Sequence, residues 1–158
     1  MSTLKTIILI AACALPSWTL AAKWIYSSDE NPLTDKTSIT MATIHTSDMS
    51  AKIIIVDSIS GVEVTLPLGF IEPHCKDHCS LLIRADKSAP VVFKASFHPG
   101  LLGGNFSLNS PSEFVKYIKF AREIIVGIED HGSRKEQWIP IATFKVDGPP
   151  LRLRSLRN

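Results

Sequence analysis

The chain has 158 residues, of which 45% are hydrophobic, and a formal net charge of +2. This length is enough for one domain with its own hydrophobic core. A nearly neutral chain argues against nucleic acid as a partner, because phosphate binding needs a concentrated basic surface.

The start of the chain has the pattern of a bacterial export signal. Lys5 supplies a positive charge, residues 6–15 form an apolar run, and Thr19 and Ala21 place small residues before a cleavage site. A retained membrane anchor is the alternative, but the apolar run is too short to span a bilayer. We therefore expect a signal peptide over residues 1–21 and a periplasmic or secreted protein without a stable membrane span.

Short strands separated by turns are expected from residue 22 onward. An aromatic strand is predicted over residues 23–26, followed by a turn region over 27–36 that is rich in serine, aspartate, asparagine and proline. Alternating residues predict further strands over 38–45 and 62–66, and a continuous Ile-Ile-Ile-Val run predicts one over 52–56, which forms a hairpin with the strand over 62–66.

The middle of the chain predicts a second hairpin, from strands over residues 79–85 and 91–96. Residues 97–109 are rich in glycine and are expected to be irregular. Two more strands are predicted over 124–128 and 138–146. The last is interrupted by Pro140, which suits an edge strand or a bulge.

One segment has the pattern of a helix. Ser110, Pro111 and Glu113 fit a capping box, in which the serine and glutamate side chains satisfy free amides at the helix start. Apolar residues then recur at helical spacing and predict one buried face, made of Phe114, Tyr117, Ile118, Ala121 and Ile124 or Ile125. This helix should lead almost directly into the strand that follows it.

These elements predict a mainly β (α+β) domain. About seven short strands point to an antiparallel β-sandwich or barrel, with the helix of the C-terminal third covering one end or one face. We expect a single domain over residues 22–150 and a basic tail over 151–158. In the tail Arg152, Arg154 and Arg157 alternate with leucines. The tail is expected to be solvated, and contact with an anionic surface or partner is the alternative.

Two cysteines remain once the predicted signal, which contains Cys13, is removed. Cys75 and Cys79 are only four residues apart, and a pair in an oxidising compartment favours an intramolecular disulfide. A fully extended chain would hold them roughly 13 Å apart, so the residues between them must turn or coil.

A metal site is the alternative for the same cluster. His74, Asp77 and His78, together with the two thiolates, are all ligands that zinc or copper accepts. Their spacing matches none of the standard zinc patterns, however, and we predict no cofactor.

No catalytic motif is present in the sequence. There is no Gly-x-Ser-x-Gly elbow, and no histidine lies beside a serine or carboxylate in a recognised pattern. The glycine-rich stretch over residues 100–105 lacks the lysine of a phosphate-binding loop. We therefore do not expect an enzyme.

A family resemblance begins with Trp24, Tyr26, Asp29 and the Pro-Leu-Thr-Asp-Lys run at 32–36. This opening resembles small exported bacterial proteins of the invasion-associated locus B type and certain type VI secretion accessory proteins. The resemblance continues through residues 81–86, the helix-to-strand unit and residues 144–148, although Ala85 stands where those proteins have an aromatic residue. It implies an exported β-rich domain and supplies no catalytic residues, since members largely lack an assigned activity.

The sequence thus predicts a non-enzymatic module that binds or stabilises a protein partner in an envelope or secretion context. Two alternatives remain open. One is a metal-binding protein that uses the cluster at residues 74–79, and the other is a small envelope hydrolase.

Overall fold

The computed structural model describes residues 21–31, 36–69, 75, 78–100, 103–130, 137–153 and 156. The predicted signal therefore lies outside the described residues, except for Ala21. Within the described ranges, no helix is long and apolar enough to cross a membrane.

All strands in the described part of the chain belong to one antiparallel sheet. Its nine strands are β1 (Ile25–Asn31), β2 (Lys36–His45), β3 (Lys52–Ser58), β4 (Gly61–Pro67), β5 (His78–Ala85), β6 (Val91–Gly100), β7 (Gly103–Leu108), β8 (Glu123–Asp130) and β9 (Gln137–Lys145). Their order across the sheet is β1-β2-β3-β4-β7-β6-β5-β8-β9. The mainly β class is confirmed, but the sheet is a half-barrel of nine strands, whereas a sandwich or barrel of about seven short strands was predicted.

Alternation along the strands decides which side of the sheet becomes the core. In β3, Ile53 and Ile55 are fully buried while their neighbours are half-buried, and Leu81 and Ile83 of β5 repeat this pattern. Successive side chains of a strand point to opposite faces, so the buried set defines an inner face and the other set an outer face.

The glycine-rich segment that was expected to be irregular is a strand pair. β6 continues to Gly100 and pairs with β7, so that Phe97 lies opposite Phe106 with their ring centroids 5.1 Å apart. At Gly104 a Cβ atom would collide with the ring of Phe97, so glycine is required there by close approach. The glycines therefore obscured the sequence pattern of a strand, in which Phe106 and Leu108 are buried at alternate positions.

The first predicted turn is also shorter than expected. β1 runs to Asn31 and β2 begins at Lys36, so only residues 32–35 remain between them, and these lie outside the described part. A bulge between Asp29 and Glu30 shifts the register of the pair. Strand pairing with β2 overrides the turn preference of these residues.

The helix forms where it was predicted but is shorter and capped differently. α1 (Pro111–Ile118) has its proline in the first turn, but the Ser110 side chain makes no capping hydrogen bond, so the predicted capping box is wrong. Only the Ser110 carbonyl is used, accepting from the Phe114 amide at 3.2 Å. The helix ends at Ile118 because the Ala121 amide turns back to the Ile118 carbonyl and β8 begins two residues later.

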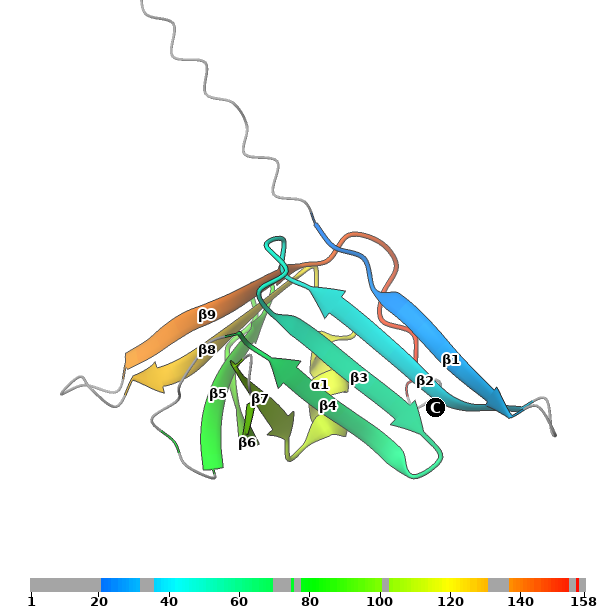
Figure 1. Cartoon of the computed structure of the whole chain (residues 1–158). Coiled ribbons are helices and arrows are strands. Elements are labelled where there is room, and N and C mark those ends of the chain that lie inside the picture. The colour runs from blue at the N-terminus through cyan, green and yellow to red at the C-terminus, as the bar shows by residue number, and fades with distance from the viewer. Residues whose placement is uncertain are drawn as a thin grey trace, which may run out of the picture.

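The helix packs on the inner face of the sheet (Figure 1). Phe114, Val115 and Ile118 are buried, and the Phe114 ring meets Phe93 of β6 edge-to-face at 5.5 Å. Val115 was not among the residues predicted for this face, and Tyr117 is only half-buried. The expectation that one helix covers one face of the strands is confirmed.

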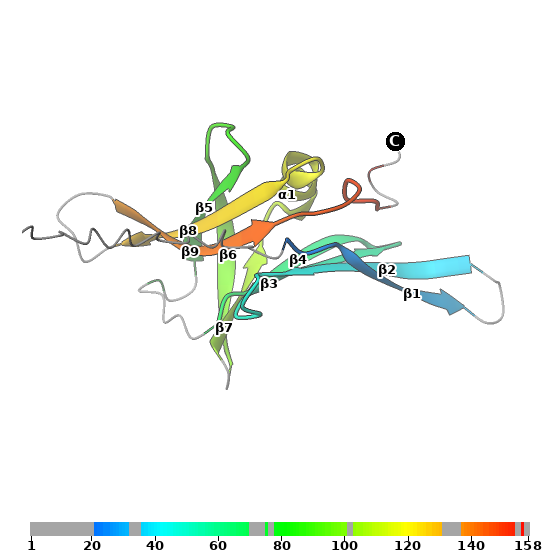
Figure 2. The same ribbon diagram turned by 90° about the horizontal axis from the view of Figure 1, so that it is seen from above.

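The two edges of the sheet meet at one end and separate at the other. Ala22, just before β1, forms a parallel bridge with Val146, just after β9. The Ala22 amide donates to the Lys145 carbonyl, and the Asp147 amide donates to the Ala22 carbonyl, both at 2.8 Å. From this junction the edge strands run apart, as seen from the side and from above (Figures 1 and 2).

The start of the predicted tail fills the opening between the separated edges. Leu151 and Leu153 are 1% and 2% exposed and belong to the core, so the prediction of a solvated tail is wrong for them. The Leu151 amide donates to the Lys119 carbonyl beyond α1, and the Arg152 amide donates to the Tyr26 hydroxyl, both at 3.0 Å. The alternation of leucine and arginine therefore belongs to an extended segment with one face on the core, at least as far as Leu153.

Replacing Leu151 with alanine should lower the free energy of unfolding by about 2–5 kcal/mol, because it leaves a cavity between β1 and α1. Chemical denaturation measures this change. Arg152→Ala is the matched control, since its side chain is exposed and the loss should stay within about 0.5 kcal/mol. Equal effects of the two substitutions would contradict the placement of this segment in the core.

Candidate functional site

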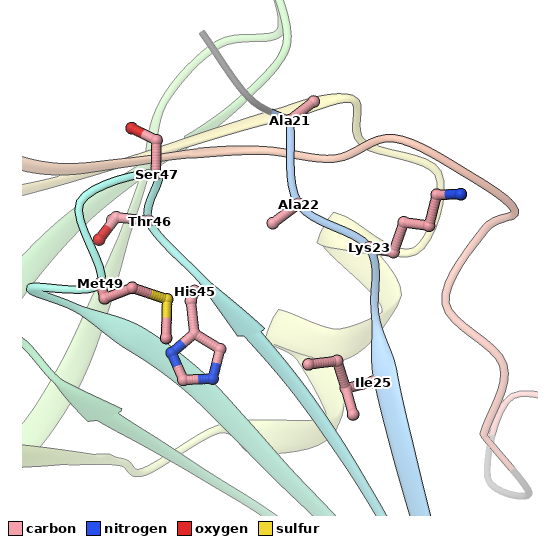
Figure 3. Close-up of a pocket in the computed structure, with 8 residues that line it drawn as sticks. All are labelled: Ala21, Ala22, Lys23, Ile25, His45, Thr46, Ser47 and Met49. Atoms are coloured by element: carbon pink, nitrogen blue, oxygen red, sulfur yellow. The ribbon is translucent and has the colours of Figure 1, made fainter.

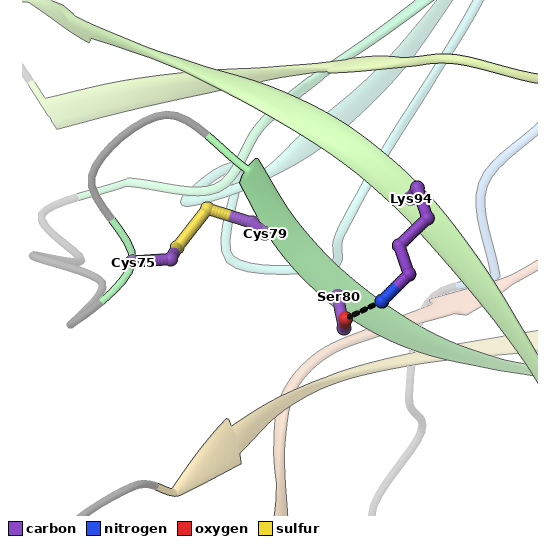
Figure 4. The surroundings of a disulfide bond; sticks show 4 residues. All are labelled: Cys75, Cys79, Ser80 and Lys94. Atoms are coloured by element: carbon purple, nitrogen blue, oxygen red, sulfur yellow. Dashed lines mark hydrogen bonds between the residues drawn. A yellow bond between two sulfur atoms is a disulfide. The ribbon is translucent and has the colours of Figure 1, made fainter.

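The predicted disulfide is present between Cys75 and Cys79 (Figure 4). Their Cα atoms are 5.3 Å apart, which is within the range of a disulfide. Cys79 is buried in β5 opposite Ala95, while Cys75 is half-buried and packs against the core. The bond therefore ties the segment before β5 to the sheet.

The residues of the alternative metal site are only partly described. His74 and Asp77 lie outside the described residues, and His78 is exposed at the first position of β5, opposite Ser96. Cysteines joined as a disulfide offer no thiolate ligands. Across the ranges that the structure describes, no three histidine, cysteine, aspartate or glutamate side chains gather as a metal site.

The intact oxidised protein should be about 2 Da lighter than the reduced protein, since two thiol hydrogens are lost when the bond forms. Reduction should also lower the free energy of unfolding by about 2 kcal/mol, the value expected for so short a loop. Mass spectrometry and denaturation measure these two changes. Cys75→Ser is the control and should abolish the mass difference, whereas free thiols with bound metal in the wild type would contradict the pairing.

A first hollow of about 330 Å³ lies between the start of β1 and the turn that joins β2 to β3 (Figure 3). Its walls are mainly apolar and include Ala22, Ile25 and Met49, and His45 projects into it. The Nδ1 atom of His45 is buried and has no hydrogen-bond partner among the described residues. This hollow brings an imidazole next to the first described residues, Ala21 and Ala22.

The hydroxyl groups around this hollow serve the turn. The Asp48 carboxylate accepts from Thr46 Oγ1 at 2.6 Å, from Ser50 Oγ at 2.7 Å and from the Ser50 amide at 3.1 Å. Ser47 points away from the imidazole (Figure 3), and no hydrogen bond joins His45 to Thr46 or Ser47 in the described structure. The arrangement stabilises a tight turn and does not pair a nucleophile with a base.

Hydrogen bonds from the Thr46 and Ser50 side chains lower the pKa of Asp48 from 3.8 to about 2. The contribution of Asp48 to stability is present above pH 3.8 and is lost as the pH falls toward 2. The reason is that the carboxylate takes up its proton at a lower pH in the folded state than in the unfolded state. Thr46→Val should raise the pKa of Asp48 toward its ordinary value, as measured by carboxyl NMR titration. Ser47→Ala, in the same turn but without a bond to Asp48, should leave the pKa unchanged, and equal pKa values in all three proteins would contradict this account.

A second hollow, of about 320 Å³, lies on the outer face of β5, β8 and β9. We call it the outer groove, and it is lined by Leu82, Arg84, Pro90, Ile125, Gly127, Trp138 and Pro140. Its strand residues alternate with the core residues Leu81, Ile83, Ile124 and Val126, so the groove opens on the side of the sheet opposite α1.

Strand pairing explains why the surface is hollow at this point. Gly127 lies between Leu82 of β5 and Pro140 of β9 across the sheet, so the middle of three neighbouring positions has no side chain. In the adjacent row, Ile125 lies beside Arg84. On the other side, Trp138 stands opposite Glu129 at the start of β9. A glycine surrounded by larger side chains leaves a notch in the sheet surface.

The edge strand β9 contributes two features that were predicted only in part. Pro140 lies on an edge strand beside a bulge at Val126 and Gly127, as its interruption of the last strand suggested. At Gly127 a Cβ atom would come within 3.2 Å of the Ile139 carbonyl, tighter than most such contacts. The backbone at this point therefore disfavours a side chain at position 127, which lies inside the groove.

The rim of the groove beside Pro90 is fixed by bonds to the helix side of the sheet. Tyr117 Oη donates to the Ala89 carbonyl at 2.8 Å and lies 2.9 Å from Ser88 Oγ. Asp86, at φ 52°, accepts from the amides of Arg122 and Glu123, both at 2.8 Å. These contacts hold the β5–β6 turn, and with it Pro90, in one position.

Sequence reasoning did not find this groove. Leu82, Arg84 and Ile125 were placed on strands, but their neighbours across the sheet were unknown. The signal that could have found it is a pair of strands with apolar residues on both faces, since a solvated antiparallel strand usually has one polar face.

Comparison with known proteins adds no relative: no family model, no curated protein and no solved structure matches this chain.

Proposed function

We propose that this protein is an exported, non-enzymatic module that binds a protein partner in the bacterial cell envelope, and that the outer face of β5, β8 and β9 is the binding surface. The single observation that carries the proposal is the outer groove, an apolar hollow on a sheet face that no described part of the chain covers. Such hollows with a few polar groups are typical of binding sites.

The composition of this face supports a protein as the partner. Leu82, Ile125 and Trp138 are half-buried, and Val92, beside Leu82, is 47% exposed. The other face of the same strands is already buried in the core, so the core does not need the apolar residues of the outer face. Tryptophan and arginine are enriched among the residues that dominate binding energy at protein interfaces, and both line this groove.

The export context rests on two features of the chain. The signal-peptide pattern of residues 1–21 predicts passage across the inner membrane, and the Cys75–Cys79 bond fits an oxidising compartment. A small domain with a disulfide and a half-barrel sheet is well suited to present a fixed surface outside the cytoplasm.

Purification of the tagged protein from its native envelope tests the proposal. We expect one specific partner with the wild type and an affinity about 30-fold lower for Trp138→Ala, the loss typical of an interface residue worth 2 kcal/mol or more. Met41→Ala is the matched control, because Met41 is also exposed and on the outer face, but on β2 at the far end of the sheet.

Two results would contradict the proposal. Recovery of no specific partner at native expression would argue against a binding module. Equal recovery with Trp138→Ala and Met41→Ala would show that the partner binds elsewhere on the protein.

A further inference from the structure

We propose that the outer groove binds a segment of the partner protein in which one large apolar side chain is followed by an acidic side chain. The proposal rests on the proposed function and adds the chemistry of the partner. The apolar side chain would enter the notch above Gly127, and the acidic side chain would bind Arg84.

The outer groove has room for a large side chain. Its volume of about 320 Å³ is at the lower end of the range of roughly 300–1,000 Å³ found for ligand pockets, so a large side chain fits within it. Leu82 and Pro140 flank Gly127 on its two sides, and Ile125 and Trp138 lie along β8 and β9. An aromatic or branched aliphatic side chain can therefore contact apolar groups on several sides, with Trp138 available for ring packing.

Arg84 gives the groove its charge. It is exposed, it is the one charged residue that lines the hollow, and no hydrogen bond or ion pair joins it to another residue in the described ranges. An arginine forms two parallel hydrogen bonds with a carboxylate, and these are stronger than hydrogen bonds between neutral groups. The free guanidinium beside an apolar notch therefore favours a carboxylate next to an apolar side chain.

Two other charged groups on this face make contacts within the protein. Lys94 Nζ donates to Ser80 Oγ at 2.8 Å (Figure 4), and Glu129, opposite Trp138, takes part in an interaction within the protein. Among the described residues, Arg84 is the cation that lines the groove itself. Arg84 lies opposite Ile125, which is two residues from Gly127 along β8. The notch for the apolar side chain and the guanidinium for the acidic side chain are therefore neighbours.

NMR titration with short end-blocked peptides tests the inference. The probe is a six-residue peptide with one phenylalanine followed by one glutamate, among glycines and serines. Two control peptides carry glutamine in place of the glutamate, or alanine in place of the phenylalanine. The indole N–H of Trp138 reports binding, and that of Trp24, which is 9% exposed in the core, is the internal control.

The acidic peptide should shift the Trp138 signal and leave that of Trp24 in place, with an affinity about tenfold above that of either control peptide. Arg84→Gln should reduce its affinity to that of the glutamine peptide. Lys94→Gln, which removes a neighbouring cation from the same face, should have little effect. Both substituted side chains are exposed, so the variants should keep the folded spectrum.

Several outcomes would overturn the inference. These are equal binding of the acidic and glutamine peptides, an unchanged affinity in Arg84→Gln, or no movement of the Trp138 signal up to millimolar peptide. If acetate ion alone binds as tightly as the acidic peptide, an apolar side chain is not part of the recognition. The proposed function fails separately, because it depends on whether Trp138→Ala loses the native partner, whatever the charge of that partner.

Discussion

The structure depends on one constraint, which is that a single bent sheet must cover its own inner face. Nine strands form a half-barrel, and the bridge between Ala22 and Val146 joins its two edges at one end only. The separated edges leave an opening that would expose the isoleucines and leucines of the inner face. Two further elements fill this opening: α1, with Phe114 fully buried, and the extended segment that carries Leu151 and Leu153. Each is bonded to the other through the Leu151 amide and the Lys119 carbonyl, so the two act as one cover.

Filling the inside of the half-barrel decides where a ligand can bind. Small closed barrels that hold a ligand leave their interior open, but here the inner face is packed with side chains and its largest residues are fully buried. The two hollows formed by described residues both lie away from this packed interior. One lies beside the first residues of β1 and the turn after β2, and the other lies on the outer face next to the edge strand β9.

The sequence predicted the parts of this fold that depend on local chemistry. Alternation predicted most strands within a few residues, Pro140 predicted an edge or a bulge, and the short spacing of Cys75 and Cys79 predicted their bond. The errors arose where long-range packing decided the outcome. β7 was not predicted because the glycine at position 104 makes room for the ring of Phe97, which belongs to a different strand. Leu151 was assigned to a tail because its contacts with residues near α1 and β1 are distant in sequence. The outer groove could not be predicted for the same reason, since it is assembled from three strands whose order was unknown.

The groove lies beside the two features that protect the sheet edge from pairing with another chain, which are Pro140 and the bulge in the β8–β9 pair. An open edge strand invites pairing with another chain, and β9 discourages this with Pro140, which has no amide to donate, and with a bulge that disturbs its register. Beside this bulge the Ile139 carbonyl lies close to position 127, which favours glycine there, and the missing side chain leaves the notch between Leu82 and Pro140. The edge of the sheet at β9 therefore resists pairing with other chains and also carries a hollow on its outer face. Replacing Gly127 with a larger residue would test directly whether the edge and the groove are connected, because the new side chain should disturb both the pairing of β8 with β9 and the binding of a partner.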